Sequence, residues 1–213
     1  MISEEKKQKF LKMSPEDFDK YMCETYPKIF RQRNMPMNQT CMCWGFNIGK
    51  GWYAILDNLC EKLDFISKIS GVNTIFVQIK EKFGGARYYY QLECSKENEN
   101  TKIYIDIIET LINSAERKSD YACAECGEFR DKMISVGGWV YDVCKKCFPK
   151  VFPDRKEMLE DYNKKQEIWE ELENAYYYAN DKEIKEFVKL QKKVSKRIEN
   201  DRKKMTKEYN KRK

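Results

Sequence analysis

Two pairs of closely spaced cysteines constrain this chain of 213 residues more than any other feature. Cys123 and Cys126 form the first C-x₂-C pair, and Cys144 and Cys147 form the second. Each pair places two thiolates on one side of an ion, and two pairs complete the tetrahedral sulfur shell, at about 2.3 Å, that Zn²⁺ prefers. A redox dithiol and simple burial are the alternatives. We predict a structural zinc site, because four sulfur ligands leave no open position for a reacting water.

The segment between the two pairs has the pattern of a β-hairpin. One apolar run ends at Val136, the chain reverses through Gly137-Gly138, and a second run begins at Trp139. A hairpin of this kind brings the second cysteine pair back to the first. The sequence therefore predicts a zinc ribbon over residues 121–150, with Trp139 packed inside it in preference to being exposed.

The chain contains no histidine, which excludes several classes of function. Hydrolases with an imidazole base, histidine-metal nucleases and mixed Cys/His zinc fingers all need a ring nitrogen. The composition is 41% hydrophobic, enough for a globular core. Five cysteines remain outside the two pairs, an odd number that argues against a disulfide framework and favours a reducing compartment.

Positive charge is concentrated at the C-terminal end. Residues 182–213 contain 14 Lys or Arg and 5 Asp or Glu, a local charge of +9, so the rest of the chain carries −3 of the total of +6. Such a tail suits an anionic partner. The sequence has neither a membrane-spanning apolar run nor a signal-peptide segment, so we expect a cytoplasmic protein with no membrane partner.

The rest of the sequence predicts a mixed α+β fold. Ser14-Pro15 is a helix start with a stop near Pro27, and an apolar stripe from Trp52 to Ile66 predicts a helix that ends at Gly71. Thr74–Lys80 alternates as a strand, with Ile75, Val77 and Ile79 on one face and Phe76, Gln78 and Lys80 on the other. Residues 86–92 predict its hairpin partner, and a further helix reaches about residue 118.

These elements divide the chain into four expected parts. Residues 1–40 are an N-terminal helical extension, 41–120 an α+β core of helix and antiparallel hairpin, and 121–150 the zinc ribbon. From residue 154 to 213 the apolar residues follow three- and four-residue steps, which predicts a long, coiled-coil-like helical arm. The arm is either one helix or a helical hairpin, and it offers a surface for oligomerisation.

Several short motifs carry a family resemblance over roughly residues 41–148. They are Trp44-Gly45-Phe46, Gly49-Lys50-Gly51-Trp52-Tyr53, Leu59-Cys60, the stretch from Val77 to Tyr89, and the cysteine pairs with Gly138-Trp139 between them. In the order and the residues of these motifs, the chain resembles uncharacterised small proteins of bacteria, prophages and phages that end in a zinc-ribbon-like module. The resemblance implies a fold unit and a phage or prophage origin, and it implies no activity.

The turn between the two predicted strands is the first candidate binding site. Lys80, Lys82 and Arg87 surround Gly84-Gly85, and three tyrosines follow. Cations beside stackable rings suit single-stranded nucleic acid, whereas a solvated hairpin tip over core tyrosines is the structural alternative. In the tail, Lys192, Lys193 and Arg197 are candidates for the same anionic partner.

Two other motifs have a chemical and a structural interpretation. Asp57, Glu61 and Glu81 with Lys80 could form a carboxylate and lysine nuclease site, although no acidic residue precedes Lys80 on its strand. Gly49-Lys50-Gly51 before a helix could bind an anion, but it lacks phosphate-loop spacing, so a tight turn is favoured.

The sequence therefore predicts a non-enzymatic binding protein with no catalytic residues, in which zinc fixes the ribbon and basic residues contact nucleic acid. The expected role is that of a phage or prophage accessory factor. The alternative is a protein-interaction factor, such as an inhibitor of a host enzyme, with a host or phage protein as partner. A metal-dependent nuclease is the third hypothesis.

Overall fold

The structure is a computed structural model, and it describes residues 2–94, 100–130, 134–136 and 139–155. Beyond these it describes only 157–160, 162–164, 166–167, 192–193, 196, 199–200 and 203. The chain divides into two compact units. The first consists of residues 1–135 and 139–151, and the second of 136–138 and 152–213. All of the fold described below, apart from the end of β4 at Val136 and the residues after 151, belongs to the first unit.

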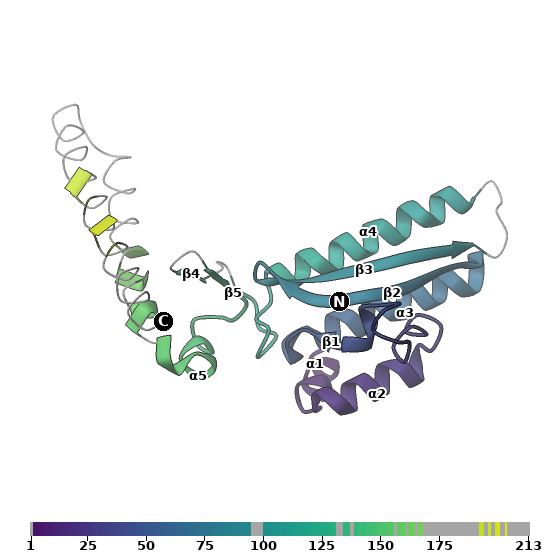
Figure 1. Cartoon of the computed structure of the whole chain (residues 1–213), viewed down its shortest axis with the longest axis horizontal. Helices are drawn as coiled ribbons and strands as arrows, with labels where there is room; N and C mark the ends of the chain where they lie inside the picture. The colour runs from purple at the N-terminus through teal and green to yellow at the C-terminus, as the bar shows by residue number, and fades with distance from the viewer. Residues whose placement is uncertain are drawn as a thin grey trace. The chain divides into compact units, whose positions relative to one another are not determined.

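This unit contains five helices and five strands among the described residues (Figure 1). The helices are α1 (Glu4–Leu11), α2 (Pro15–Thr25), α3 (Tyr53–Ser70), α4 (Thr101–Asp120) and α5 (Phe148–Val151), with short 3₁₀ turns at Met42–Trp44 and Lys50–Trp52. The strands are β1 (Phe46–Asn47), β2 (Val72–Lys82), β3 (Gly85–Cys94), β4 (Ile134–Val136) and β5 (Trp139–Tyr141). A mixed α+β fold is therefore confirmed.

Capping residues set the ends of the predicted helices. The Ser14 hydroxyl accepts a hydrogen bond from the Asp17 N–H at 3.0 Å and caps α2. Gly71 ends α3 in the left-handed region, at φ 74°. Helix α1 was missed, although Ser3 caps it and Glu4 and Glu5 favour its N-terminus.

Strands β1, β2 and β3 form one sheet, and β2 and β3 are its long antiparallel hairpin (Figure 1). Predicted strict alternation along β2 is wrong, because a β-bulge lies between Phe76 and Gln78. The extra residue puts Phe76 and Ile79 into the same hydrophobic core, while Val77 is only partly buried. After the bulge, Gln78 pairs with Tyr89 and Lys80 pairs with Arg87, so these four side chains share the opposite face.

A chain of aromatic contacts joins the N-terminal helices to the sheet. Phe18 of α2 stacks on Tyr53 of α3 with ring centroids 3.6 Å apart, and it also meets Phe46 of β1. Phe46 in turn contacts Phe30, which stacks on Phe76 of β2. Residues 1–40 thus share the hydrophobic core with the helices α3 and α4, and in the structure they are part of the first unit, as is the cysteine segment.

The predicted arm lies mostly outside the described residues. Those residues that are described between 157 and 203 are helical, and Lys203 pairs with Glu199 one turn away at 2.7 Å. The coiled-coil hypothesis and the choice between one helix and a hairpin fall on residues that the structure does not describe. Within the described residues, no helix has the length and apolar content needed to cross a membrane.

A buried carboxylate fixes α1 on α3. The Asp57 side chain is 2% exposed, its Oδ2 lies 2.5 Å from the Lys6 Nζ, and its Oδ1 accepts a hydrogen bond from the Tyr26 hydroxyl at 3.0 Å. Burial and the neighbouring carboxylate raise the pKa of Tyr26, so it stays a donor. Glu61 also contacts Lys6, at 3.2 Å. The N-terminal helix is therefore held by charge as well as by Phe10.

Replacing Lys6 by alanine should lower the free energy of unfolding by about 2 kcal/mol, because the Asp57 carboxylate stays buried without its cation. Lys7→Ala is the control, since it removes only the exposed pair with Glu4 and should cost less than about 0.5 kcal/mol. Urea denaturation at pH 7 measures both. Equal effects of the two variants would contradict this role of Lys6.

Candidate metal centre and adjoining surfaces

The four cysteines of the two C-x₂-C pairs come together in the structure. The sulfur atoms of Cys123, Cys126, Cys144 and Cys147 all lie within 4.8 Å of one another, and those of Cys126 and Cys144 are 3.9 Å apart. Sulfur ligands at about 2.3 Å from one tetrahedral ion would lie about 3.8 Å from each other. The cluster is therefore close enough to hold a metal ion, and all four donors are thiols.

Local backbone geometry turns each pair toward the cluster. In the first pair, the Gly127 N–H donates to the Cys123 carbonyl at 2.8 Å, and Gly127 has φ 69°, which favours glycine. In the second pair, the Cys147 N–H donates to the Cys144 carbonyl at 3.0 Å. The Cys144 N–H also donates to the Cys123 sulfur at 3.2 Å. Two tight turns thus present their sulfurs to the same point, and β4 and β5 lie between them in the sequence.

The surroundings of the cluster shift the pKa values of its thiols, and a cationic side chain lies beside it. Burial raises the pKa of Cys126 to about 11 and also raises the pKa of Cys147, whereas hydrogen bonds to its sulfur lower the pKa of Cys144 against the effect of burial. The side chain of Arg130 is buried nearby, and desolvation lowers its pKa. With a divalent ion bound to four thiolates, a cation at this position would offset part of the remaining negative charge.

Gly49-Lys50-Gly51 packs directly against the first cysteine turn. The Gly51 N–H donates to the Ala124 carbonyl at 2.7 Å, and a Cβ at Gly51 would lie 2.1 Å from the Cys123 carbonyl oxygen. A Cβ at Gly49 would lie 2.3 Å from the Ala124 oxygen. These glycines therefore allow two backbones to touch. The favoured interpretation as a tight turn missed this contact, which no local pattern reveals.

Two side chains extend the contact between the core and the first cysteine turn. The fully buried Trp52 donates from its Nε1 to the Ala122 carbonyl at 2.7 Å, and Lys50 pairs with Glu125 at 2.7 Å. The Lys50 pair is partly exposed and contributes little. The Trp52 bond is buried and joins the start of α3 to the residue that precedes Cys123.

Arg130 joins the cysteine segment to the tip of the β2–β3 hairpin. Its guanidinium donates to the carbonyls of Gly84, Ser119 and Tyr141, the last at 2.9 Å. It thus connects the hairpin turn, the end of α4 and β5 by one side chain. Its role could have been suspected only from its place four residues after Cys126.

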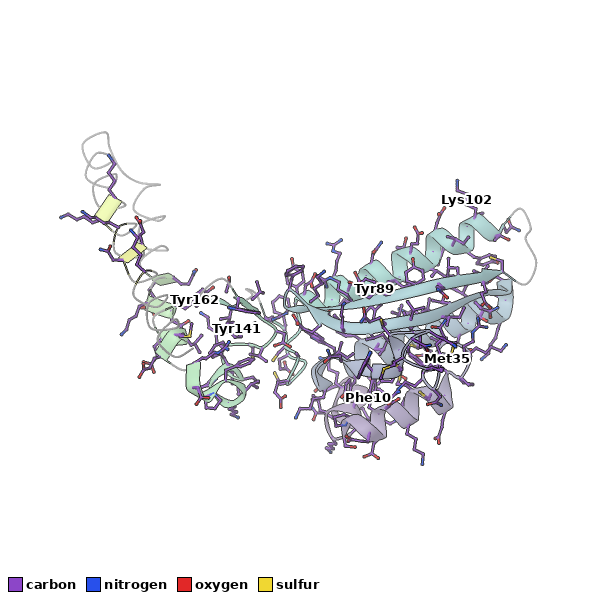
Figure 2. All side chains as sticks on the ribbon, in the orientation of Figure 1. Phe10, Met35, Tyr89, Lys102, Tyr141 and Tyr162 are labelled. Atoms are coloured by element: carbon purple, nitrogen blue, oxygen red, sulfur yellow. The ribbon has the colours of Figure 1, made fainter. Side chains whose placement is uncertain are left out.

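The predicted hairpin cations lie on one face, but they differ in their partners. Lys80 Nζ lies 5.2 Å from the centroid of the Tyr89 ring, and Lys82 Nζ lies 5.2 Å from that of Phe83. Arg87 pairs with Asp120 at 3.1 Å. Of the three tyrosines, Tyr88 is buried, and Tyr89, which is labelled in Figure 2, is 40% exposed. The structure therefore brings Lys80 and Tyr89 together and leaves Tyr88 in the core.

The carboxylates of the nuclease hypothesis do not meet Lys80. Asp57 and Glu61 contact Lys6, and the Glu81 carboxylate accepts a hydrogen bond from the Gly84 N–H at 2.6 Å. Within the part of the chain that the structure describes, the cysteines are the one group of three or more potential metal ligands. The described residues thus form no carboxylate cluster of the kind that this hypothesis needs.

The remaining predicted residues have mixed outcomes. Lys192 and Lys193 are helical and exposed, whereas Arg197 lies outside the described residues. Trp139 is 71% exposed on β5, so the prediction that it packs inside the cysteine module is wrong. The core of this module is built by Tyr141 and Phe148, whose rings meet edge to face at 4.9 Å.

Comparison with protein-family models, curated proteins and solved structures finds no match for this chain. Its function is therefore argued from its own residues.

Cys144→Ser should abolish stoichiometric metal binding, because the site then loses one of its four sulfur ligands. Cys41→Ser is the matched control, since Cys41 is an exposed free cysteine outside the cluster. Elemental analysis of the purified proteins measures the metal content per chain, expected to be about one for the control. Equal metal content in both variants would contradict the four-cysteine site.

Gly51→Ala should destabilise the protein by about 2 kcal/mol, because the new methyl group collides with the Cys123 carbonyl. Without that contact the same change would stabilise by about 0.5 kcal/mol, so the sign is diagnostic. Lys50→Ala, at the neighbouring position, should change stability by less than about 1 kcal/mol. Thermal unfolding of the metal-loaded proteins tests the contrast, and a more stable Gly51→Ala variant would disprove the close backbone packing.

Proposed function

We propose that this protein is a non-enzymatic nucleic-acid-binding protein whose cysteine cluster holds a structural zinc ion. A donor set of four sulfurs is typical of structural zinc, and it leaves no position for substrate or water. In this proposal Cys123, Cys126, Cys144 and Cys147 hold the ion, and it supplies only structural stability. The zinc ribbon, with the β4–β5 hairpin between its ligand turns, is part of the proposal.

The face of the β2–β3 hairpin opposite the helical core carries the binding role. The observation behind it is the pairing of Lys80 with Tyr89, in which an exposed ring lies 5.2 Å from a cation. Lys80 has no carboxylate partner among the described residues, and neither has Lys82. A stackable ring beside free ammonium groups matches a base and its phosphate in a single strand.

Arg87 has a different role in this proposal from the one expected. Its pair with Asp120 fixes the turn end of the hairpin on the end of α4, and so Arg87 orients the face more than it contacts a phosphate. The exposed Lys192 and Lys193 add nonspecific attraction for the same polyanion. A phage or prophage origin, as the sequence resemblance implies, remains part of the proposal.

Lys80→Gln combined with Lys82→Gln should weaken binding of mixed-sequence single-stranded DNA or RNA and flatten its salt dependence. The loss of two phosphate contacts lowers the slope of log K against log salt by about 1.4. Fluorescence anisotropy at several salt concentrations measures this slope. Tyr89→Ala should weaken binding by about 1–3 kcal/mol with an unchanged slope, because it removes stacking and no charge.

The control is Lys20→Gln combined with Lys28→Gln, which makes the same change in net charge at exposed positions on α2 and just beyond it. It should leave the slope within error of the unmodified protein. If both double variants behave alike, only overall charge matters, and the hairpin face is not the binding surface.

A second candidate function is protein binding, and exposed Trp139 favours it. Aromatic residues of this size are enriched at the centres of protein interfaces. A partner protein that stays bound in the presence of nuclease and high salt, and that Trp139→Ala releases, would favour this function over nucleic-acid binding.

A further inference from the structure

A basic groove lies beside the first cysteine turn, on elements other than the β2–β3 hairpin. This open groove has a volume of about 840 Å³, within the range of about 300–1,000 Å³ usual for small-molecule sites. Its walls come from α4, the start of α3, the N-terminal segment and the turn that follows Cys123. No residue of the proposed nucleic-acid face lines it.

One side of α4 forms the polar wall of the groove. The lining residues of this helix recur at steps of three and four, as the turns of a helix require: Thr110, Asn113, Ser114, Arg117, Lys118 and, just past the helix end, Tyr121. They offer hydroxyl, amide and cationic groups. In this wall Arg117 and Lys118 supply only hydrogen-bond donors, whereas the Thr110 hydroxyl already donates to the Asp106 carbonyl at 2.8 Å.

The charge of the groove has one sign. Lys7, Arg117 and Lys118 line it, and no aspartate or glutamate does so among the described residues. Lys7 has the exposed Glu4 at 3.4 Å, whereas no described carboxylate lies within ion-pair distance of Arg117 or Lys118. A smaller hollow shares Lys118 and adds Lys62. Several cations without counterions favour an anionic occupant.

An exposed aromatic pair stands next to these cations. The rings of Tyr121 and Phe129 are nearly parallel, at 9°, with centroids 6.2 Å apart, and they are 52% and 74% exposed. Both residues line the groove. Exposed rings of this kind are stacking surfaces for nucleobases. Arg117 and Tyr121 are one helical turn apart, a rise of about 6 Å, comparable with the reach from a phosphate across ribose to its base.

We propose that this groove binds a nucleoside 5′-phosphate, with Arg117 and Lys118 on the phosphate and the Tyr121–Phe129 pair against the base. The apolar floor, from Ile55 and Ala54, accommodates the sugar edge. The ligand is either a free nucleotide or the 5′-phosphorylated end of a strand, since both carry the same groups. Because the groove and the hairpin share no residue, this site stands independently of the proposed nucleic-acid face.

Isothermal titration of the metal-loaded full chain tests the site. The probes are adenosine and guanosine 5′-monophosphates, their nucleosides, inorganic phosphate, and short oligonucleotides with and without a 5′-phosphate. Nucleotides should bind at least about tenfold more tightly than either the nucleosides or phosphate, because each fragment keeps only one of the two contacts. In the Lys80→Gln, Lys82→Gln protein, tighter binding of the 5′-phosphorylated than of the unphosphorylated oligonucleotide identifies a strand end, and equal binding of the two oligonucleotides beside saturable mononucleotide binding identifies a free nucleotide.

Arg117→Gln combined with Lys118→Gln should weaken nucleotide binding by at least about tenfold, through loss of charged hydrogen bonds. Phe129→Ala should weaken it by about fivefold or more, through loss of stacking. The charge control is Lys20→Gln with Lys102→Gln, of which Lys102 lies at the other end of α4 (Figure 2). The aromatic control is Phe65→Ala, which removes an exposed phenylalanine of α3 that does not line the groove. Circular dichroism and metal content confirm that each variant is folded.

Absence of saturable nucleotide binding at millimolar concentration would overturn the proposal. So would groove variants that bind as tightly as their controls. The Lys80→Gln, Lys82→Gln protein separates the two sites: it should keep nucleotide binding, and if it alone loses binding, the nucleotide belongs to the hairpin face and the groove proposal is wrong.

Discussion

The first unit of this protein depends on a contact between two stretches of backbone. Gly51 donates to the Ala124 carbonyl, and neither Gly49 nor Gly51 leaves space for a Cβ against the first cysteine turn. Close approach of this kind is possible only because glycine has no side chain. It joins the start of α3 directly to the turn that carries Cys123, so that order in the cysteine cluster and order in the core support each other.

Arg130 completes this coupling on the other side of the cysteine segment. A buried guanidinium with several carbonyl acceptors is costly to desolvate, and burial lowers its pKa accordingly. Its Nη atoms keep their three carbonyl acceptors only while the hairpin turn at Gly84, the end of α4 and β5 keep their places, and its buried Nε has no hydrogen-bond partner among the described residues. The cysteine segment, α4 and the β2–β3 hairpin therefore form one cooperative assembly.

In the two proposals, a closed metal site supports binding without contacting the ligand. The turn that the cysteines hold also supplies Phe129 and Ala122 to the basic groove, and Arg130 fixes the hairpin whose outer face carries Lys80. Both proposed binding surfaces are thus positioned by elements that contact the cysteine turn. In the two proposals, the ion shapes recognition surfaces and contacts no ligand.

The sequence alone determined the features that depend on local spacing: the cysteine pairs, the helix at Ser14-Pro15, the end of α3 at Gly71 and the β2–β3 hairpin. The interactions that produce these features involve residues that are close together in the sequence. The bulge at Val77, the exposure of Trp139 and the docking of Gly51 on Cys123 were decided by the tertiary structure. Each of these depends on which distant backbone or side chain occupies the adjoining space. The pattern of residues that are neighbours in the sequence does not contain this information.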